Sequence, residues 1–285
     1  MEVTHSSKAM LTMATQIRRD ILRMVHAVNS GHPGGSLGCA DYFTALFFHF
    51  MKHNASHFSM NGNGEDVFFL SNGHISPVYY SALARVGYFP VSELATFRKL
   101  NTRLQGHPAT HEHLPGIRVA TGSLGQGLSV AAGLALQKKM DKDSHTVWVQ
   151  TGDGELQEGQ IWEAVMFASH QKLDNMIVAV DFNQKQIDGS TGEIMGLTEW
   201  KSKFLAFNWE VLEMDGNHWD DIMRVVPQAQ SKLGAGKPIV IIMKTEMGQG
   251  VDFMMGTHAW HGKAPNDEQL EKALAQLSET EHSDY

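Results

Sequence analysis

An acidic side chain and an amide side chain follow two neighbouring apolar stretches of this sequence. Residues 147–154 read VWVQTGDG, and residues 176–183 read MIVAVDFN, with a helix-like segment between them. Asp153 and Asn183 therefore stand at the ends of two expected strands. In a parallel sheet all strands end on one edge, and ligands bind there. The two side chains can therefore converge on one ion.

The residue types at this edge suit a hard divalent cation. Carboxylate, amide and carbonyl oxygens are ligands of Mg²⁺, with phosphate oxygens and water completing its octahedron. Gly152 and Gly154 let the backbone approach a ligand closely, and a helix N-terminus that follows Gly154 would favour an anion. Gly-Asp-Gly by itself is also a common turn with a solvated acid. The matching Asn183 favours the interpretation as a metal and diphosphate site.

Together these residues resemble the signature of the thiamine-diphosphate enzymes, in which Gly-Asp-Gly is followed after a gap by Asn-Asn. Phe182 stands where the first Asn is usual, whereas Asn183 keeps the ligand-bearing position. Five further motifs resemble transketolase, in transketolase order, over about Lys8 to Leu277. They are SGHPGGSLG at 30–38, SNGH at 71–74, GHP at 106–108, TGSLGQGLSVAAG at 121–133 and HAWHG at 258–262.

The resemblance implies a cofactor site made of thiamine diphosphate and Mg²⁺, or Ca²⁺ or Mn²⁺ in its place. Asp153, Asn183 and the carbonyl of Lys185 match the metal ligands. The remaining positions that match cofactor contacts are His74, Gly122, Ser123, Leu124, Gly152, Gly154, Glu158 and His261. Asp188 resembles a position near the cofactor, although an Asp before Gly189 is equally typical of a turn.

The resemblance also implies that His32, His107 and His261 line the channel to the reactive carbon of the cofactor. A ketose cleaved between C2 and C3 must release a hydroxyl proton, and the acceptor sugar must regain one. Imidazole titrates near neutral pH and can do both, while the carbanion chemistry belongs to the cofactor. A single histidine in a glycine-flanked loop is more often structural, and His258 fits a neighbouring structural role as well as a catalytic one.

Alternating strands and helices must position these residues. The periodicity predicts strands over 66–70, 146–154, 175–183, 209–216 and 238–246. It predicts helices over 7–29, 36–50, 77–86, a segment ending near 140, 158–171, 198–208, 218–233 with a proline interruption, and 266–277. Residues 100–118 read as irregular loop. This alternation predicts an α/β fold with a mostly parallel sheet and helices on both faces, in one domain over residues 1–285.

Composition excludes several other classes. The chain has 285 residues, and its net charge of −8 comes from 23 basic and 31 acidic residues, which argues against a general nucleic-acid binder. Cys39 is the single cysteine, so no internal disulfide is expected. The start lacks a signal-peptide pattern, and the apolar stretches are too short for a membrane span. We therefore expect a cytoplasmic protein. The glycines of GSLGQG do not have the spacing of a dinucleotide-binding motif.

The resemblance further implies a partner chain. Complete transketolases have a second α/β domain, which supplies a glutamate to the pyrimidine ring, and a C-terminal domain, and no residue here matches that glutamate. Glu158 matches an acid that pairs with the missing glutamate across the subunit interface, and Glu163 is another family match in the same expected helix. A solvated helix face is the alternative for both. We therefore expect the N-terminal subunit of a split transketolase, active with a separate C-terminal subunit in an α2β2 heterotetramer.

Such an enzyme would transfer a two-carbon ketol unit between sugars or sugar phosphates, with pentose phosphates as the default substrates and a specialised sugar possible. In transketolases the substrate phosphate is held mostly by basic residues outside this domain. Two alternatives stay open: the α subunit of a 2-oxo acid dehydrogenase or decarboxylase, and a non-catalytic cofactor-binding module. SGHPGGSLG and the final HG favour transketolase.

Overall fold

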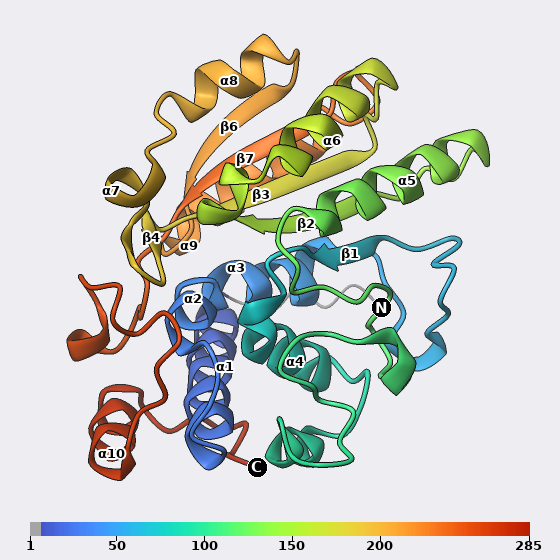
Figure 1. Ribbon diagram of the computed structural model, residues 1–285. Helices are drawn as coiled ribbons and strands as arrows, with labels where there is room; N and C mark the ends of the chain where they lie inside the picture. Colours follow the sequence, from blue (N-terminus) through green and yellow to red (C-terminus); the bar gives the residue numbers. More distant parts are fainter. Residues whose placement is uncertain (1–6) are drawn as a thin grey trace.

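Five parallel strands form the central sheet of the protein, in the order β1-β2-β3-β7-β6 (Figure 1). The structure is a computed structural model and describes residues 7–285. The strands are β1 Val67–Leu70, β2 Val147–Gly152, β3 Met176–Phe182, β6 Glu210–Asp215 and β7 Ile239–Lys244. The prediction of an α/β fold with a mostly parallel sheet is confirmed, and this sheet is parallel throughout.

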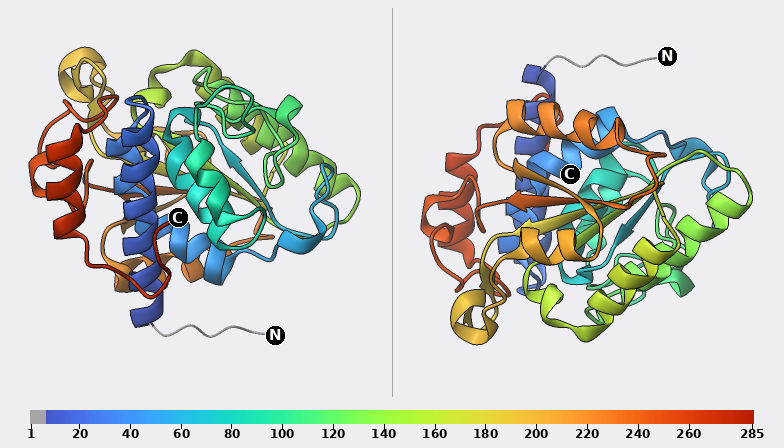
Figure 2. Two further views of the ribbon diagram at one scale, coloured as in Figure 1. Left: turned by 90° about the horizontal axis from the view of Figure 1, so that it is seen from below. Right: turned by 90° about the horizontal axis from the view of Figure 1, so that it is seen from above.

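Helices cover both faces of the sheet. One face packs against α1 Ser7–Ala27, α3 Ala40–Ala45, α4 Ser76–Arg85 and α9 Trp219–Gln230, and the other packs against α5 Gln126–Met140, α6 Gly159–His170 and α8 Trp200–Ala206. Seen from below, α1 and α4 lie in front of the sheet, with α10 Asp267–Gln276 beside α1 (Figure 2). This two-sided cover explains why the strand sequences are continuous apolar runs.

Alternate residues of each strand enter different cores. Phe68 packs with the α1 side of the sheet, whereas Val67 and Phe69 pack with the α5 side. In β3, Ile177 and Val178 divide in the same way. Because successive strand side chains point to opposite faces, one apolar run fills two layers of core.

The structure differs from the predicted elements in three places. The helix expected over 36–50 begins earlier, as α2 Pro33–Gly38, with proline in its first turn, and it is interrupted at Cys39 before α3 and a π-helical turn at Leu46–Phe50. Proline suits a first turn because its missing amide hydrogen has no partner there. Pro227 lies inside α9 without ending it. A hairpin, β4 Lys185–Gln186 with β5 Gly189–Ser190, and the short α7 Thr191–Met195 were not predicted.

No helix within residues 7–285 is both long and apolar enough to cross a membrane.

A buried ionic network joins α1 to α4, the helix that starts two residues after His74. Asp20 is fully buried and accepts two hydrogen bonds from Arg85, at 2.9 and 2.8 Å, and one from Ser81 at 2.7 Å. Gln16 donates a further bond at 3.1 Å. A buried charge pair of this kind is costly to break, because the surviving partner stays in a low-dielectric surrounding.

We predict that Asp20→Ala lowers the free energy of unfolding by about 3 to 5 kcal/mol, since it leaves the Arg85 guanidinium buried and unpaired. Urea denaturation followed by circular dichroism measures this loss. The control is Glu271→Ala on the exposed side of α10, which should change stability by less than about 0.5 kcal/mol. Equal losses in the two variants would contradict the prediction.

Candidate active site

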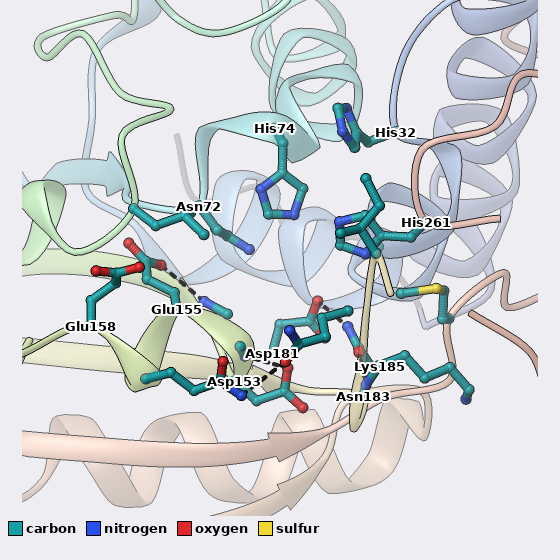
Figure 3. Close-up of a pocket in the computed structure, with 18 of the residues that line it drawn as sticks. His32, Asn72, His74, Asp153, Glu155, Glu158, Asp181, Asn183, Lys185 and His261 are labelled. Carbon is teal, nitrogen blue, oxygen red and sulfur yellow. Dashed lines mark hydrogen bonds between the residues drawn. The ribbon is translucent and has the colours of Figure 1, made fainter. Parts of the chain in front are cut away.

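A cavity of about 290 Å³ opens at the carboxyl edge of the sheet (Figure 3). The segment after β1 contributes Asn72 and His74, and the loops before α2 and after β7 contribute His32 and His261. The ends of β2 and β3 and the segments that follow them supply most of the remaining lining: Gly152, Asp153, Gly154, Glu155, Gln157, Glu158, Asp181, Asn183, Lys185 and Gln186. The cavity is where a parallel sheet is expected to hold a ligand.

Asp153 and Asn183 converge at this edge, as their positions in the sequence predicted. The Asp153 carboxylate accepts hydrogen bonds from the backbone amides of Gly154 at 2.7 Å and Gln184 at 2.5 Å. The Asn183 amide donates to Asp181 at 2.9 Å and accepts from the Lys185 backbone amide at 2.9 Å. Because Gln184 directly follows Asn183, the end of β2 is tied to the end of β3.

The pKa values of the acidic side chains at this edge are raised. Burial and the neighbouring Asp181 carboxylate raise the pKa of Asp153 to about 8. Burial raises the pKa of Asp181 to about 6, although Thr245 and Asn183 donate hydrogen bonds to it. A cation placed between these oxygens would favour the charged form of both acids.

The donor set at this edge fits a hard cation held together with phosphate. Within residues 7–285 no group of three or more His, Cys, Asp or Glu side chains is arranged to hold a metal. One carboxylate, one amide oxygen and one carbonyl make a partial ligand set, which phosphate oxygens and water would complete. The residues present therefore fit a diphosphate with its divalent ion.

Glu155 holds three segments of the cavity wall together, and the sequence did not single it out. Its carboxylate accepts hydrogen bonds from Ser71 at 2.6 Å, from the Gly125 amide at 2.9 Å and from the Gly152 amide at 3.1 Å. These partners lie after β1, before α5 and at the end of β2. An acid just after Gly-Asp-Gly reads as solvated, so the sequence carries no clear signal for this role.

Asn72 is a second lining residue that sequence reasoning did not find. Its side-chain oxygen Oδ1 is buried and has no hydrogen-bond partner, and its side chain faces the cavity near His74 (Figure 3). A buried polar atom without a partner is costly, so a ligand that donates a hydrogen bond here would be favoured. The sequence signal that could have indicated Asn72 is its position in the SNGH motif, two residues before His74.

Four histidine rings gather over the cavity, from segments far apart in the sequence. The ring centroids of His32 and His74 are 5.2 Å apart, those of His74 and His261 are 5.1 Å apart, and those of His32 and His261 are 5.6 Å apart. His107 lies 6.2 Å from His32. The Nδ1 atoms of His32 and His261 are buried without hydrogen-bond partners.

Burial keeps these histidines neutral. It lowers the pKa of His32 to about 4 and that of His74 well below its usual value, with smaller contributions from neighbouring histidines. The pKa values of His107 and His261 are also lowered, chiefly by burial. A neutral imidazole has one nitrogen that donates and one that accepts, which is the state required to receive a proton.

The structure places the remaining predicted residues in three ways. Gly122 and Leu124 line the cavity, and Gly122 has a φ of 134° and lies so close to the His107 ring that a Cβ would come within 2.8 Å of it. Glu158 lines the mouth and is exposed, and His107 is exposed at the rim. The predicted residues that are exposed and outside the lining are Ser123, Glu163, Asp188 and His258.

Comparison with known proteins identifies relatives across the chain. Residues 10–283 match the family described as transketolase, thiamine diphosphate binding domain. The chain is 40% identical over 267 residues to the 6-deoxy-6-sulfo-D-fructose transketolase subunit SqwG of Clostridium sp. (strain MSTE9), covering 93% of this chain and 94% of that one. It is 37% identical over 262 residues to an apulose-4-phosphate transketolase subunit from Phocaeicola vulgatus, covering 92% and 91%.

Solved structures of transketolases resemble this chain as well. Transketolase from Campylobacter jejuni superposes with a TM-score of 0.88 at 34% identity, covering 96% of this chain and 43% of that chain. Transketolase from Leishmania mexicana superposes with a TM-score of 0.87 at 30% identity, covering 95% and 41%. The chain thus spans less than half the length of these transketolases and more than nine-tenths of the length of the two subunits.

The lowered pKa of His32 predicts a pH-dependent loss of stability. The folded-state pKa of about 4 lies below the ordinary value of 6.5, so the unfolded chain binds more protons between these values. The stability from neutral His32 is fully present above pH 6.5 and is lost as the pH falls toward 4. We expect the wild type to lose about 1 to 3 kcal/mol more than His32→Gln over this range. Urea unfolding at each pH measures the difference, and parallel pH curves would contradict it.

Proposed function

Because this chain belongs to the transketolase family, as its thiamine-diphosphate-binding part, we propose that it transfers a two-carbon ketol unit from a ketose to an aldose together with a separate subunit. The observation that carries the proposal is the cavity in which Asp153 and Asn183 lie below a cluster of neutral histidines. One edge of the sheet thus offers a diphosphate site and groups that move protons. The names of the relatives favour transketolase over a 2-oxo acid dehydrogenase subunit.

The cofactor part of the proposal rests on the strand ends. Asp153, Asn183 and the backbone carbonyl of Lys185 would hold Mg²⁺, with Ca²⁺ or Mn²⁺ as substitutes. The Lys185 side chain is engaged elsewhere, since its Nζ pairs with Glu246 at 3.0 Å. The diphosphate and the rest of the cofactor would lie against His74, Gly122, Leu124, Gly152 and Gly154, all of which line the cavity. Thiamine diphosphate, when bound, supplies the carbanion chemistry that side chains lack.

The histidines would handle the protons of the sugar. His32 and His261 each present a buried nitrogen without a partner, and His107 stands at the rim 6.2 Å from His32. A neutral ring accepts the hydroxyl proton as the bond between C2 and C3 of the ketose breaks, and the protonated ring returns it to the acceptor aldose. Burial also removes water, which keeps the proton between protein and sugar.

A partner chain completes the proposed enzyme. Relatives of matching length are called subunits of transketolases, which supports a separate partner subunit. We propose that this partner is a C-terminal subunit and that the two chains form an α2β2 assembly, which rests on the family resemblance alone. Glu158 is exposed at the mouth of the cavity, where it would face a partner residue. Ser123 is exposed and would contact the cofactor together with its neighbours Gly122 and Leu124. We further propose that residues 1–285 form one diphosphate-binding domain and that the protein is cytoplasmic. Both points rest on the sequence.

We propose the chemical class of the sugar substrate and not an individual sugar. Two of the relatives carry names with a sulfo-sugar and a sugar phosphate, so a ketose with an anionic group is the preferred donor. Pentose phosphates are the default within that class.

Reconstitution tests the function directly. We expect this chain, co-purified with its partner subunit in the presence of thiamine diphosphate and Mg²⁺, to convert ketose phosphates when an aldose acceptor is supplied. The chain alone should show no turnover, because the pyrimidine ring would lack its glutamate. Full turnover by the isolated chain would refute the partner requirement. Pyruvate turnover without ketose turnover would refute the assignment of the reaction.

Asp153→Ala should separate cofactor binding from folding. The substitution removes the charged ligand. Loss of an outer-shell partner alone costs about 10- to 100-fold, so we expect the affinity of the assembled complex for thiamine diphosphate with Mg²⁺ to fall by at least about 100-fold. Isothermal titration calorimetry measures the affinity, and circular dichroism checks the fold. The control Glu213→Ala alters an exposed acid of β6. Unchanged affinity in Asp153→Ala would remove Asp153 from the metal site.

A further inference from the structure

Asp181, the next-to-last residue of β3, contacts both side-chain ligands of the proposed metal site. Its backbone carbonyl accepts a hydrogen bond from the Asp153 amide at 3.1 Å, and its carboxylate accepts one from the Asn183 side chain at 2.9 Å. The residue is buried, with 2% of its surface exposed, and it lines the cavity beside these two residues (Figure 3). Neither the ligand set nor the proton transfer proposed above uses this carboxylate.

The contact with Asp181 fixes the orientation of the Asn183 amide. An ionised carboxylate only accepts hydrogen bonds, whereas an asparagine side chain ends in a donor nitrogen and an acceptor oxygen. Asp181 therefore holds the nitrogen of Asn183, and the oxygen Oδ1 lies on the other side of the group. There Oδ1 accepts from the Lys185 backbone amide at 2.9 Å, which uses one of its two lone pairs. The second lone pair is left for a cation.

The opposite orientation of this amide is excluded by both neighbours. If the group were turned by half a revolution, its oxygen would face the Asp181 carboxylate and its nitrogen would face the Lys185 amide. Two acceptors would then meet on one side and two donors on the other, and buried polar atoms without partners are costly. The pair of neighbours thus selects one of the two orientations.

Two other parts of the chain hold the Asp181 carboxylate in place. Its Oδ1 accepts a hydrogen bond from the hydroxyl of Thr245, which follows β7 directly. On the other side lies α2, where a Cβ added to Gly35 would come within 3.7 Å of Oδ2. The buried Cys39 is a further neighbour. Both carboxylate oxygens already accept hydrogen bonds from the protein, so Asp181 differs from a side chain that is free to bind an ion.

We propose that Asp181 is a positioning residue of the metal site, which keeps the amide oxygen of Asn183 available to the divalent ion of the cofactor. The inference rests on the proposed function and deepens it, because Asp181 acts through a ligand and not on the ion. Groups that orient metal ligands in this way are needed for full metal affinity. Through its other contacts, Asp181 also ties the metal site to the segments that lead to His32 and His261.

The test measures binding of thiamine diphosphate with Mn²⁺ to the complex of this chain with its partner subunit. Isothermal titration calorimetry and the electron paramagnetic resonance of free Mn²⁺ report binding without turnover. Asp181→Ala removes the acceptor for the Asn183 amide, so the affinity should fall by about 10- to 100-fold, the usual effect of losing an outer-shell partner. Asp181→Asn keeps an oxygen that can accept in one of two orientations, so its affinity should fall by at most about twofold.

Asp66→Ala is a matched control for damage to the fold. Asp66 is a second buried aspartate, with 4% of its surface exposed, and it lies at the amino ends of the strands, away from the cavity. Its carboxylate accepts hydrogen bonds from the Thr146 amide at 2.8 Å and the Trp148 indole at 3.2 Å. The variant should lower the stability of the chain in urea and leave its affinity for thiamine diphosphate with Mn²⁺ unchanged.

A reciprocal exchange tests the proposal even if Asp181→Ala does not fold. Asn183→Asp alone sets two carboxylates against each other, and like charges at close range repel. When Asp181→Asn is added, the amide and the carboxylate change places, and the hydrogen bond returns with donor and acceptor reversed. The double variant should bind thiamine diphosphate with Mn²⁺ at least about 10-fold more tightly than Asn183→Asp, because contacting residues are coupled.

Three results would overturn the role of Asp181. They are an unchanged affinity in Asp181→Ala, equal losses in Asp181→Ala and Asp181→Asn, and a double variant that binds no better than Asn183→Asp. Equal losses would mean that the charge of Asp181 matters and the orientation of Asn183 does not. Failure of the proposed function looks different, since the wild-type complex would then bind no thiamine diphosphate with Mn²⁺.

Discussion

The parallel pairing of β2 with β3 is the interaction on which the rest of the site depends. The pairing sets Gly152 opposite Asp181, and the Asp153 amide continues it with a hydrogen bond to the Asp181 carbonyl at 3.1 Å. The carboxylate of Asp153 then accepts from the Gln184 amide. A register shift of one residue would turn these side chains to the other face. The acid and the amide meet because two backbones are held in one register.

Burial shifts the pKa values of the two kinds of titratable group in opposite directions. It raises the pKa of Asp153 to about 8 and lowers that of His32 to about 4. The acids at the strand ends are therefore suited to a cation, while the rings above them stay free to accept protons. One cavity thus provides a place for positive charge at its floor and neutral bases near its opening.

Much of this arrangement could be predicted from sequence, because it depends on local patterns. Apolar runs marked the strands, and Asp153 and Asn183 could be placed on one edge from the parallel topology alone. Glu155 could not be found in this way, since its importance comes from partners distant in sequence. Ser71 and Gly125, for example, reach Glu155 only after folding. The hairpin at 185–190 was missed because strands of two residues carry no periodicity.

The three hydrogen bonds of Glu155 have a consequence for how a cofactor enters. They fix the segments after β1, before α5 and at the end of β2 relative to one another within the chain itself. The conformational entropy of these loops is therefore lost when the protein folds and not when a ligand arrives. A preorganised wall of this kind lets a flexible diphosphate bind without ordering the protein around it.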